Sequence, residues 1–147
     1  MNLNDNIIAD IRQFNRFYTN LLGLLDKHVL DTGYSFTEAR VIVEIGLLGQ
    51  CISNNLVENL NIDRSYMSRI ITKLSNDGLI SKESSILDNR TKLIRLTPKG
   101  LDLFHQLNEK SDEQIVNLLQ GLSSKEINEI HASMLMIQKK LNMLEEI

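Results

Sequence analysis

Apolar residues recur with helical spacing at both ends of the chain. They follow one another at alternating steps of three and four residues, first between Asn4 and Leu30 and again after Ser123. The stripes consist of Ile7, Ile11, Phe14, Tyr18, Leu21 and Leu25, and of Ile127, Ile130, Met134, Ile137, Leu141 and Leu144. Such steps place one apolar stripe along a helix. We therefore predict a long helix near each terminus.

A helix is predicted to begin after Ser35. Glu38 follows this serine at the spacing of a capping box, in which each side chain bonds the other residue's backbone amide. The helix should run to about Leu48 and end at Gly49, a residue type that favours the turn after a helix. Its expected inner face is Ala39, Ile42, Val43 and Leu47.

Two further helices are predicted between Gly49 and Gly78. Ser53 is the expected N-cap of a short helix, and Asp63 is the expected N-cap of a longer one that ends near Asn76. The longer helix has an apolar face of Met67, Ile70, Ile71 and Leu74. Its opposite face carries Ser65, Ser68, Arg69, Thr72 and Lys73.

The next segment changes to short extended stretches. Apolar and polar residues mix over Leu79–Glu83 and Lys92–Leu96, with a polar connector between them, which indicates a β-hairpin. Thr97-Pro98 then starts a helix that should reach about Gln120. The predicted fold class is mainly α with a small β-hairpin wing, a winged helix-turn-helix, and we expect residues 1–147 to form a single domain.

Charge is distributed unevenly along the chain. The whole chain of 147 residues has a net charge of −3, but Ile62–Gly100 holds eight basic and four acidic residues. A basic middle between acidic ends suits a polyanionic partner, although a solvated surface of this charge is also common. The single cysteine excludes an internal disulfide and suits a reducing compartment. With no long apolar run and no secretion signal, we expect a cytoplasmic protein with no membrane partner.

Catalytic and metal-binding patterns are absent from the sequence. His28, His105 and His131 have no metal-ligand spacing with Cys51 or with one another. There is also no glycine-rich phosphate loop and no nucleophile motif. We therefore expect neither an enzyme nor a cofactor or metal site, and we expect Cys51 to be a buried, inert thiol.

The helix from Asp63 to Asn76 has the chemistry of a DNA-reading helix. Hydroxyls and arginines near its N-terminus can meet phosphates and base edges in the major groove, and a projecting wing arginine can enter the minor groove. An ordinary polar surface helix and a plain Asp-Asn turn are the alternatives. The candidate DNA-binding residues are Arg64, Ser65, Tyr66, Ser68, Arg69, Lys73, Asp88, Arg90 and Lys92.

Four motifs in this region resemble the signature of the MarR family in order and spacing. They are LNIDRSYMSRIITKL at 60–74, DGLI at 77–80, DNR at 88–90 and LTPKG at 96–100. The resemblance implies a homodimer with dimerisation helices in 1–33 and 98–147 and a DNA-binding lobe in 35–97. It also implies that the helix at 63–76 reads the major groove and that Arg90 reaches the minor groove.

The resemblance implies a function as well. We expect a sequence-specific regulator of transcription that binds a pseudo-palindromic operator in double-stranded DNA, and a repressor released by a small-molecule effector. The alternative is a dimeric interaction module that does not bind DNA. The basic wing argues against that module.

A narrower resemblance covers the first half of the chain. IRQFNRFY at 11–18, LLD at 24–26 and TEARV at 37–41 are similar to the regulator half of fusions between a MarR domain and a GNAT-type acetyltransferase. Because the sequence ends at Ile147, we expect the regulator without the acetyltransferase.

Overall fold

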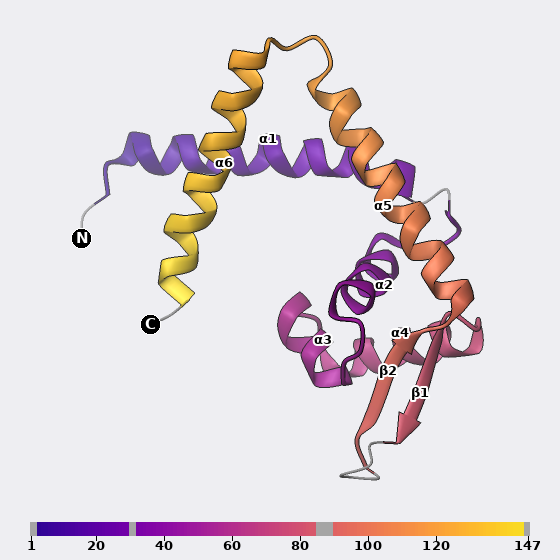
Figure 1. Ribbon diagram of the computed structural model, residues 1–147. Coiled ribbons are helices and arrows are strands. Elements are labelled where there is room, and N and C mark those ends of the chain that lie inside the picture. The colour runs from indigo at the N-terminus through magenta and orange to yellow at the C-terminus, as the bar shows by residue number, and fades with distance from the viewer. Residues whose placement is uncertain (1–2, 30–31, 85–89, 146–147) are drawn as a thin grey trace. The chain divides into compact units, whose positions relative to one another are not determined.

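The computed structural model describes residues 3–29, 32–84 and 90–145 (Figure 1). The chain forms two compact units, Met1–Ser111 and Asp112–Ile147. Its elements are α1 (Asp5–Val29), α2 (Phe36–Leu48), α3 (Ser53–Leu60), α4 (Arg64–Asn76), β1 (Ile80–Ser84), β2 (Lys92–Leu96), α5 (Pro98–Leu119) and α6 (Ser124–Glu145). This element order is a winged helix-turn-helix, and the predicted fold class is confirmed.

The wing is a two-stranded antiparallel sheet. Ile80 pairs with Leu96 at one end, and Ser84 pairs with Lys92 at the other. Cys51 adds a short bridge beside β2, because its N–H and carbonyl bond the carbonyl and N–H of Ile94 at 3.0 and 2.7 Å. These bonds attach the link between α2 and α3 to the middle of β2, which supports a sheet that would be unstable alone.

The core of the first unit is built by α2, α3, α4, the hairpin and the start of α5. Figure 1 shows α2, α3 and α4 grouped beside the base of the hairpin. The largest fully buried side chains are Val41, Ile42, Ile45, Leu56, Met67, Leu74, Leu79, Ile94 and Leu107. The apolar face predicted for α4 is buried in full.

The predicted inner face of α2 is wrong at Leu47, whose side chain is 70% exposed. At 100° per residue, Leu47 lies about 140° around the helix from Ile42, the centre of the buried face. Val41 and Ile45 are buried instead. Hydrophobicity alone did not decide which of these apolar residues packs inward.

Helix starts follow the predicted capping chemistry with one exception. The box at Ser35 and Glu38 is present, with bonds of 2.9 and 3.1 Å. A second box joins Ser123 and Glu126 at the start of α6. Ser53 is not the N-cap of α3, because it is already the first residue of the helix and the last extended residue is Ile52. Ile52 is the N-cap, and its N–H donates to Oδ1 of Asn55 at 2.9 Å.

The hairpin begins one residue later than predicted. The N–H of Leu79 donates to the carbonyl of Leu74 at 2.9 Å and so closes the end of α4. Gly78 makes this closure possible with a φ of 76°, which side chains other than glycine rarely adopt. The strand then starts at Ile80.

Apolar side chains remain exposed on the long terminal helices. On α1 they include Ile7, Ile8, Ile11, Phe14 and Phe17, and on α6 they include Met134, Leu135, Met136, Ile137, Leu141 and Met143. No helix in the described part of the chain is both long enough and apolar enough to cross a membrane.

Candidate nucleic-acid interface

Helix α4 presents one polar face to solvent. Its N-terminus is fixed by Asp63, whose Oδ2 accepts from the N–H of Tyr66 at 3.1 Å, as the sequence predicted. Met67, Ile70, Ile71 and Leu74 hold the opposite side in the core. The exposed side chains are Arg64, Ser65, Tyr66, Ser68, Arg69, Thr72 and Lys73.

Arg69 and Tyr66 form a contact on this exposed face. The guanidinium Cζ lies 5.5 Å from the centre of the tyrosine ring, within the range of a cation–π interaction. Ser65 is exposed one residue before the tyrosine. The N-terminal half of α4 therefore offers a hydroxyl, an aromatic ring and an arginine side by side.

A groove of about 390 Å³ lies between α3, α4 and the hairpin. Its lining residues are Ile52, Ser53, Asn54, Val57, Arg64, Ser68, Ile71, Thr72, Lys82, Arg90, Thr91, Lys92 and Ile94. Four of them are cations, and none of these described lining residues carries a carboxylate. Such a concave, positively charged surface suits a phosphate backbone.

The structure brings together four of the predicted site residues in this groove, namely Arg64, Ser68, Arg90 and Lys92. Ser65, Tyr66, Arg69 and Lys73 lie on the exposed part of α4 beyond it. Lys92 Nζ donates to Oγ of Ser84 across the hairpin at 2.8 Å. Asp88 lies outside the described residues.

Asn54 and Lys82 were missed by the sequence reasoning. Asn54 Oδ1 accepts from Nη2 of Arg64 at 2.8 Å, while its own amide donates to Glu58 at 3.1 Å. Lys82 shares a sheet face with Ile80, because side chains alternate along a strand. That alternation is a signal that could have placed Lys82 beside the helices, whereas nothing in the sequence pairs Asn54 with Arg64.

Lys73 differs from the other cations of the site. Its Nζ lies 2.8 Å from Oε2 of Glu38 in an ion pair, and 5.4 Å from the centre of the Tyr34 ring. The side chain of Lys73 is half exposed, whereas that of Glu38 is 11% exposed. The predicted DNA-binding lysine is thus already engaged by a nearly buried carboxylate.

Cys51 is buried, as expected. Burial raises the pKa of its thiol to about 11, and the nearby carboxylate of Glu44 acts in the same direction. A thiol with so high a pKa is almost entirely protonated near neutral pH, and the protonated form is a poor nucleophile. Within the described part of the chain, no cluster of three potential metal-binding side chains occurs.

Comparison with known proteins confirms the resemblance seen in the sequence. Residues 35–92 match the model of the MarR family. The HTH-type transcriptional regulator BilQ of Clostridium symbiosum (strain WAL-14163) is 28% identical over 89 residues, 58% of this chain and 62% of BilQ. The uncharacterized HTH-type transcriptional regulator YdgJ of Bacillus subtilis (strain 168) is 23% identical over 95 residues, 65% of this chain and 58% of YdgJ. The matches thus span about three fifths of these relatives.

Solved structures share the fold. A MarR family transcription regulator superposes with a TM-score of 0.81 and 19% identity, over 97% of this chain and 94% of the other. A mutant of MarR from E. coli, crystallised with operator DNA, gives a TM-score of 0.74 and 19% identity, over 96% and 99%. The chain thus shares the winged helix fold of these structures, and the segment that matches the MarR family model contains α2, α3, α4, β1 and the first residue of β2.

Proposed function

We propose that this protein is a transcription regulator that binds double-stranded DNA sequence-specifically. The observation that carries the proposal is the four-cation groove beside the exposed face of α4. In this arrangement, α4 enters the major groove with Ser65, Tyr66 and Arg69 near the bases. Arg64 and Lys92 bind phosphates, and Arg90 reaches the minor groove. The relatives named as transcriptional regulators and the operator complex of a similar fold support this proposal.

The proposed regulator acts as a homodimer in the cytoplasm. The exposed apolar residues of α1 and α6 have the heptad spacing of an interface between helices, and a second copy of the chain is the partner that would cover them. A two-fold dimer presents two recognition helices, so its operator is a pseudo-palindrome with half-sites about one helical turn apart.

We further propose repression that is relieved by a small aromatic anion. A pocket of about 200 Å³ is lined by Phe36, Ala39, Arg40, Val43, Leu107 and Ser111. The guanidinium of Arg40 lies 5.8 Å from the centre of the Phe36 ring, which gives the pocket one cation among apolar walls. Titration of the DNA complex with small aromatic acids tests this step, with Arg40→Met as the variant expected to lose the response.

Selection of duplexes from a random-sequence pool by the purified protein tests the DNA-binding function. A pseudo-palindromic consensus is the expected result. Arg64→Ala should then bind the selected duplex more weakly, and its log–log salt slope should be shallower by about 0.9 for the lost phosphate contact. Arg95→Ala is the matched control, because Arg95 pairs with Ser81 on the other face of the hairpin and donates to Gln50.

An interaction module without DNA is the alternative, and the same experiment separates it. Such a module would either retain no duplex from the pool or bind every sequence with the same weak affinity. Either result would overturn the proposed function.

A further inference from the structure

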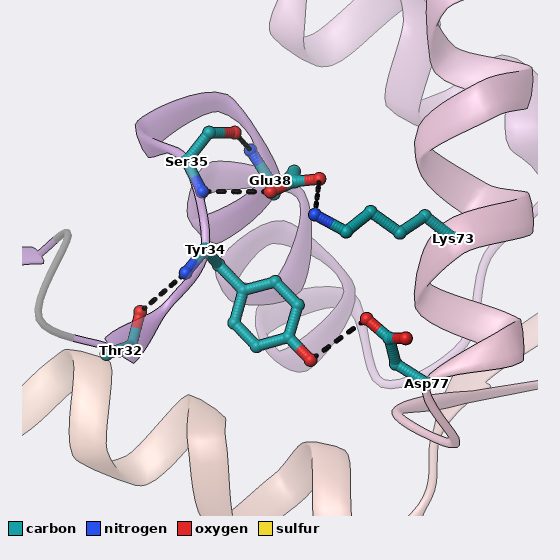
Figure 2. A network of polar contacts seen from close by, with 6 residues as sticks. All are labelled: Thr32, Tyr34, Ser35, Glu38, Lys73 and Asp77. Atoms are coloured by element: carbon teal, nitrogen blue, oxygen red, sulfur yellow. Dashed lines mark hydrogen bonds and ion pairs between the residues drawn. The ribbon is translucent and has the colours of Figure 1, made fainter.

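A side-chain network joins the start of α2 to the C-terminal half of α4. Figure 2 shows Glu38 facing Lys73 and Tyr34 facing Asp77, so that one pair joins the two helices and the other joins the residue before the N-cap of α2 to the C-cap of α4. Nζ of Lys73 lies 2.8 Å from Oε2 of Glu38, and the hydroxyl of Tyr34 donates to Oδ2 of Asp77 at 3.1 Å. The ammonium of Lys73 also lies over the Tyr34 ring. We call these four residues the α2–α4 tie.

Glu38 is held rigidly on the α2 side of the tie. Its Oε1 accepts from the N–H of Ser35, and the hydroxyl of Ser35 accepts from the N–H of Glu38. Burial alone would raise the pKa of this carboxyl, but the bonds from Lys73 and Ser35 outweigh burial and lower the pKa. Glu38 therefore stays ionised at neutral pH and offers Lys73 a fixed, partly desolvated anion.

Asp77 and Lys73 anchor the α4 side. Asp77 is the C-cap of the helix, and its carbonyl also accepts from Nζ of Lys99 at 2.8 Å. Burial and the Asp77 carboxylate raise the pKa of Tyr34, so its hydroxyl keeps the proton that it donates. The C-terminal end of α4 is thus attached at two neighbouring points, to Glu38 in the first turn of α2 and to Tyr34 just before this helix.

This geometry bears on what Lys73 does when DNA binds. A phosphate would have to compete with a carboxylate already at 2.8 Å, and withdrawal of Lys73 would leave Glu38, only 11% exposed, without its cation. An unpaired carboxylate in such a place costs free energy. The ion pair is therefore expected to persist in the complex, at the end of α4 away from Ser65 and Tyr66.

We propose that Lys73 is a positioning residue: with Glu38, Tyr34 and Asp77, it sets the orientation of α4 in which Arg69 can discriminate between base pairs. The proposal rests on the DNA-binding function above. It differs from a phosphate contact by Lys73 in one measurable respect. A phosphate contact adds affinity for every sequence and steepens the salt dependence, whereas a positioning residue adds discrimination between sequences.

Three conservative variants isolate the tie. Glu38→Gln removes the charge but keeps the capping box, because glutamine also serves at this position. Lys73→Met removes the ammonium and keeps an unbranched apolar stem. Tyr34→Phe deletes only the hydroxyl and keeps the ring beneath Lys73. Lys73→Arg retains a cation for Glu38 and is the rescue control.

The experiment compares two duplexes over a series of salt concentrations. One is the duplex selected from a random pool by the wild-type protein, and the other is a scrambled duplex of the same composition. Glu38→Gln and Lys73→Met should each lower the ratio of the affinities for the selected and scrambled duplexes about three- to thirtyfold. The double variant should lower this ratio no further than either single variant does. Salt slopes should equal that of wild type, and Lys73→Arg should retain most of the discrimination.

Hydrogen exchange at the backbone amides of α4 gives a second readout in the free protein. The last turn of α4 should exchange faster in Glu38→Gln and Tyr34→Phe than in wild type, while thermal melts confirm that the variants are folded. This readout needs no DNA, so it tests the tie even if a variant binds too weakly to measure.

Two results would overturn the inference while leaving the proposed function intact. In one, Lys73→Met weakens binding to both duplexes equally with a salt slope shallower by about 0.9, while Glu38→Gln binds as wild type or more tightly. In the other, α4 exchanges as in wild type in both Glu38→Gln and Tyr34→Phe. A wild-type protein that binds both duplexes equally would instead refute the proposed function, and the inference with it.

Discussion

The guanidinium of Arg69 lies over the ring of Tyr66, one turn earlier in α4, with 5.5 Å between Cζ and the ring centre. Both side chains are exposed, and Tyr66 is 38% exposed. The ring restricts the conformations open to a long, flexible arginine before DNA is present. A partly ordered side chain loses less conformational entropy when it binds.

Arg69→Ala should cost roughly 1–3 kcal/mol of binding free energy on the selected duplex and relax preference at one base-pair position per half-site. Tyr66→Leu should cost less, because Arg69 remains but is no longer ordered by the ring. Affinities for a set of single-substitution duplexes at fixed salt measure both effects. If Arg69→Ala binds every duplex as wild type does, α4 is not the reading helix.

Arg90→Ala should weaken DNA binding, and the loss in affinity should depend on the width of the minor groove rather than on base identity. Arg90 is exposed at the hairpin end of the groove and is proposed to enter the minor groove, where narrow A-tracts attract cations. Duplexes that differ only in flanking A-tracts provide the comparison. The loss should be greatest on the narrowest groove, with a shallower salt slope, and a loss independent of the flanks would contradict this role.

Gly100→Ala should destabilise the protein by roughly 1–3 kcal/mol. A Cβ at this buried position would overlap the backbone carbonyl of Leu79, which is fixed by its bond from the N–H of Thr97. Gly23→Ala is the control, since a Cβ there meets no described atom within 4 Å and alanine favours a helix. The melting temperature should therefore fall in Gly100→Ala and rise in Gly23→Ala. If Gly100→Ala melts at the same temperature as wild type, the hairpin backbone shifts to accommodate the extra carbon.

Ile137→Asp combined with Leu141→Asp should convert a dimer into monomer or aggregate. Both side chains are about half exposed, at 46% and 58%, and charges placed there would be buried by a second copy. Lys139→Asp, between them on the chain, is the control that should remain dimeric. Sedimentation at micromolar concentration measures the state, and a wild-type monomer would refute the dimer.

The pKa of Cys51 predicts a loss of stability at high pH. The thiol ionises near its ordinary pKa in the unfolded chain, but only at about 11 in the folded protein, so it favours the folded state below the ordinary pKa. That contribution falls as pH rises from the ordinary value toward 11. Chemical denaturation of wild type between pH 8 and pH 10 should show this fall, and Cys51→Ala should show a smaller one.

Local chemistry allowed much of the fold to be predicted from the sequence. The capping boxes at Ser35 and Ser123 and the cap at Asp63 each join residues three positions apart, so each depends only on residues close together in the sequence. The same holds for the buried face of α4. Predictions failed where packing chose among equivalent residues, as at Leu47, or where the helix began one residue earlier than predicted, as at Ser53.

For the candidate site, the sequence by itself determined which side chains lie on the outer face of α4, because helical periodicity fixes their direction. Only the tertiary structure decided which of them are free to meet a ligand. It placed Asn54 against Arg64, and Glu38 against Lys73, across separate helices. Pairing between helices depends on how their faces pack, a property of the whole core that no spacing along one helix encodes.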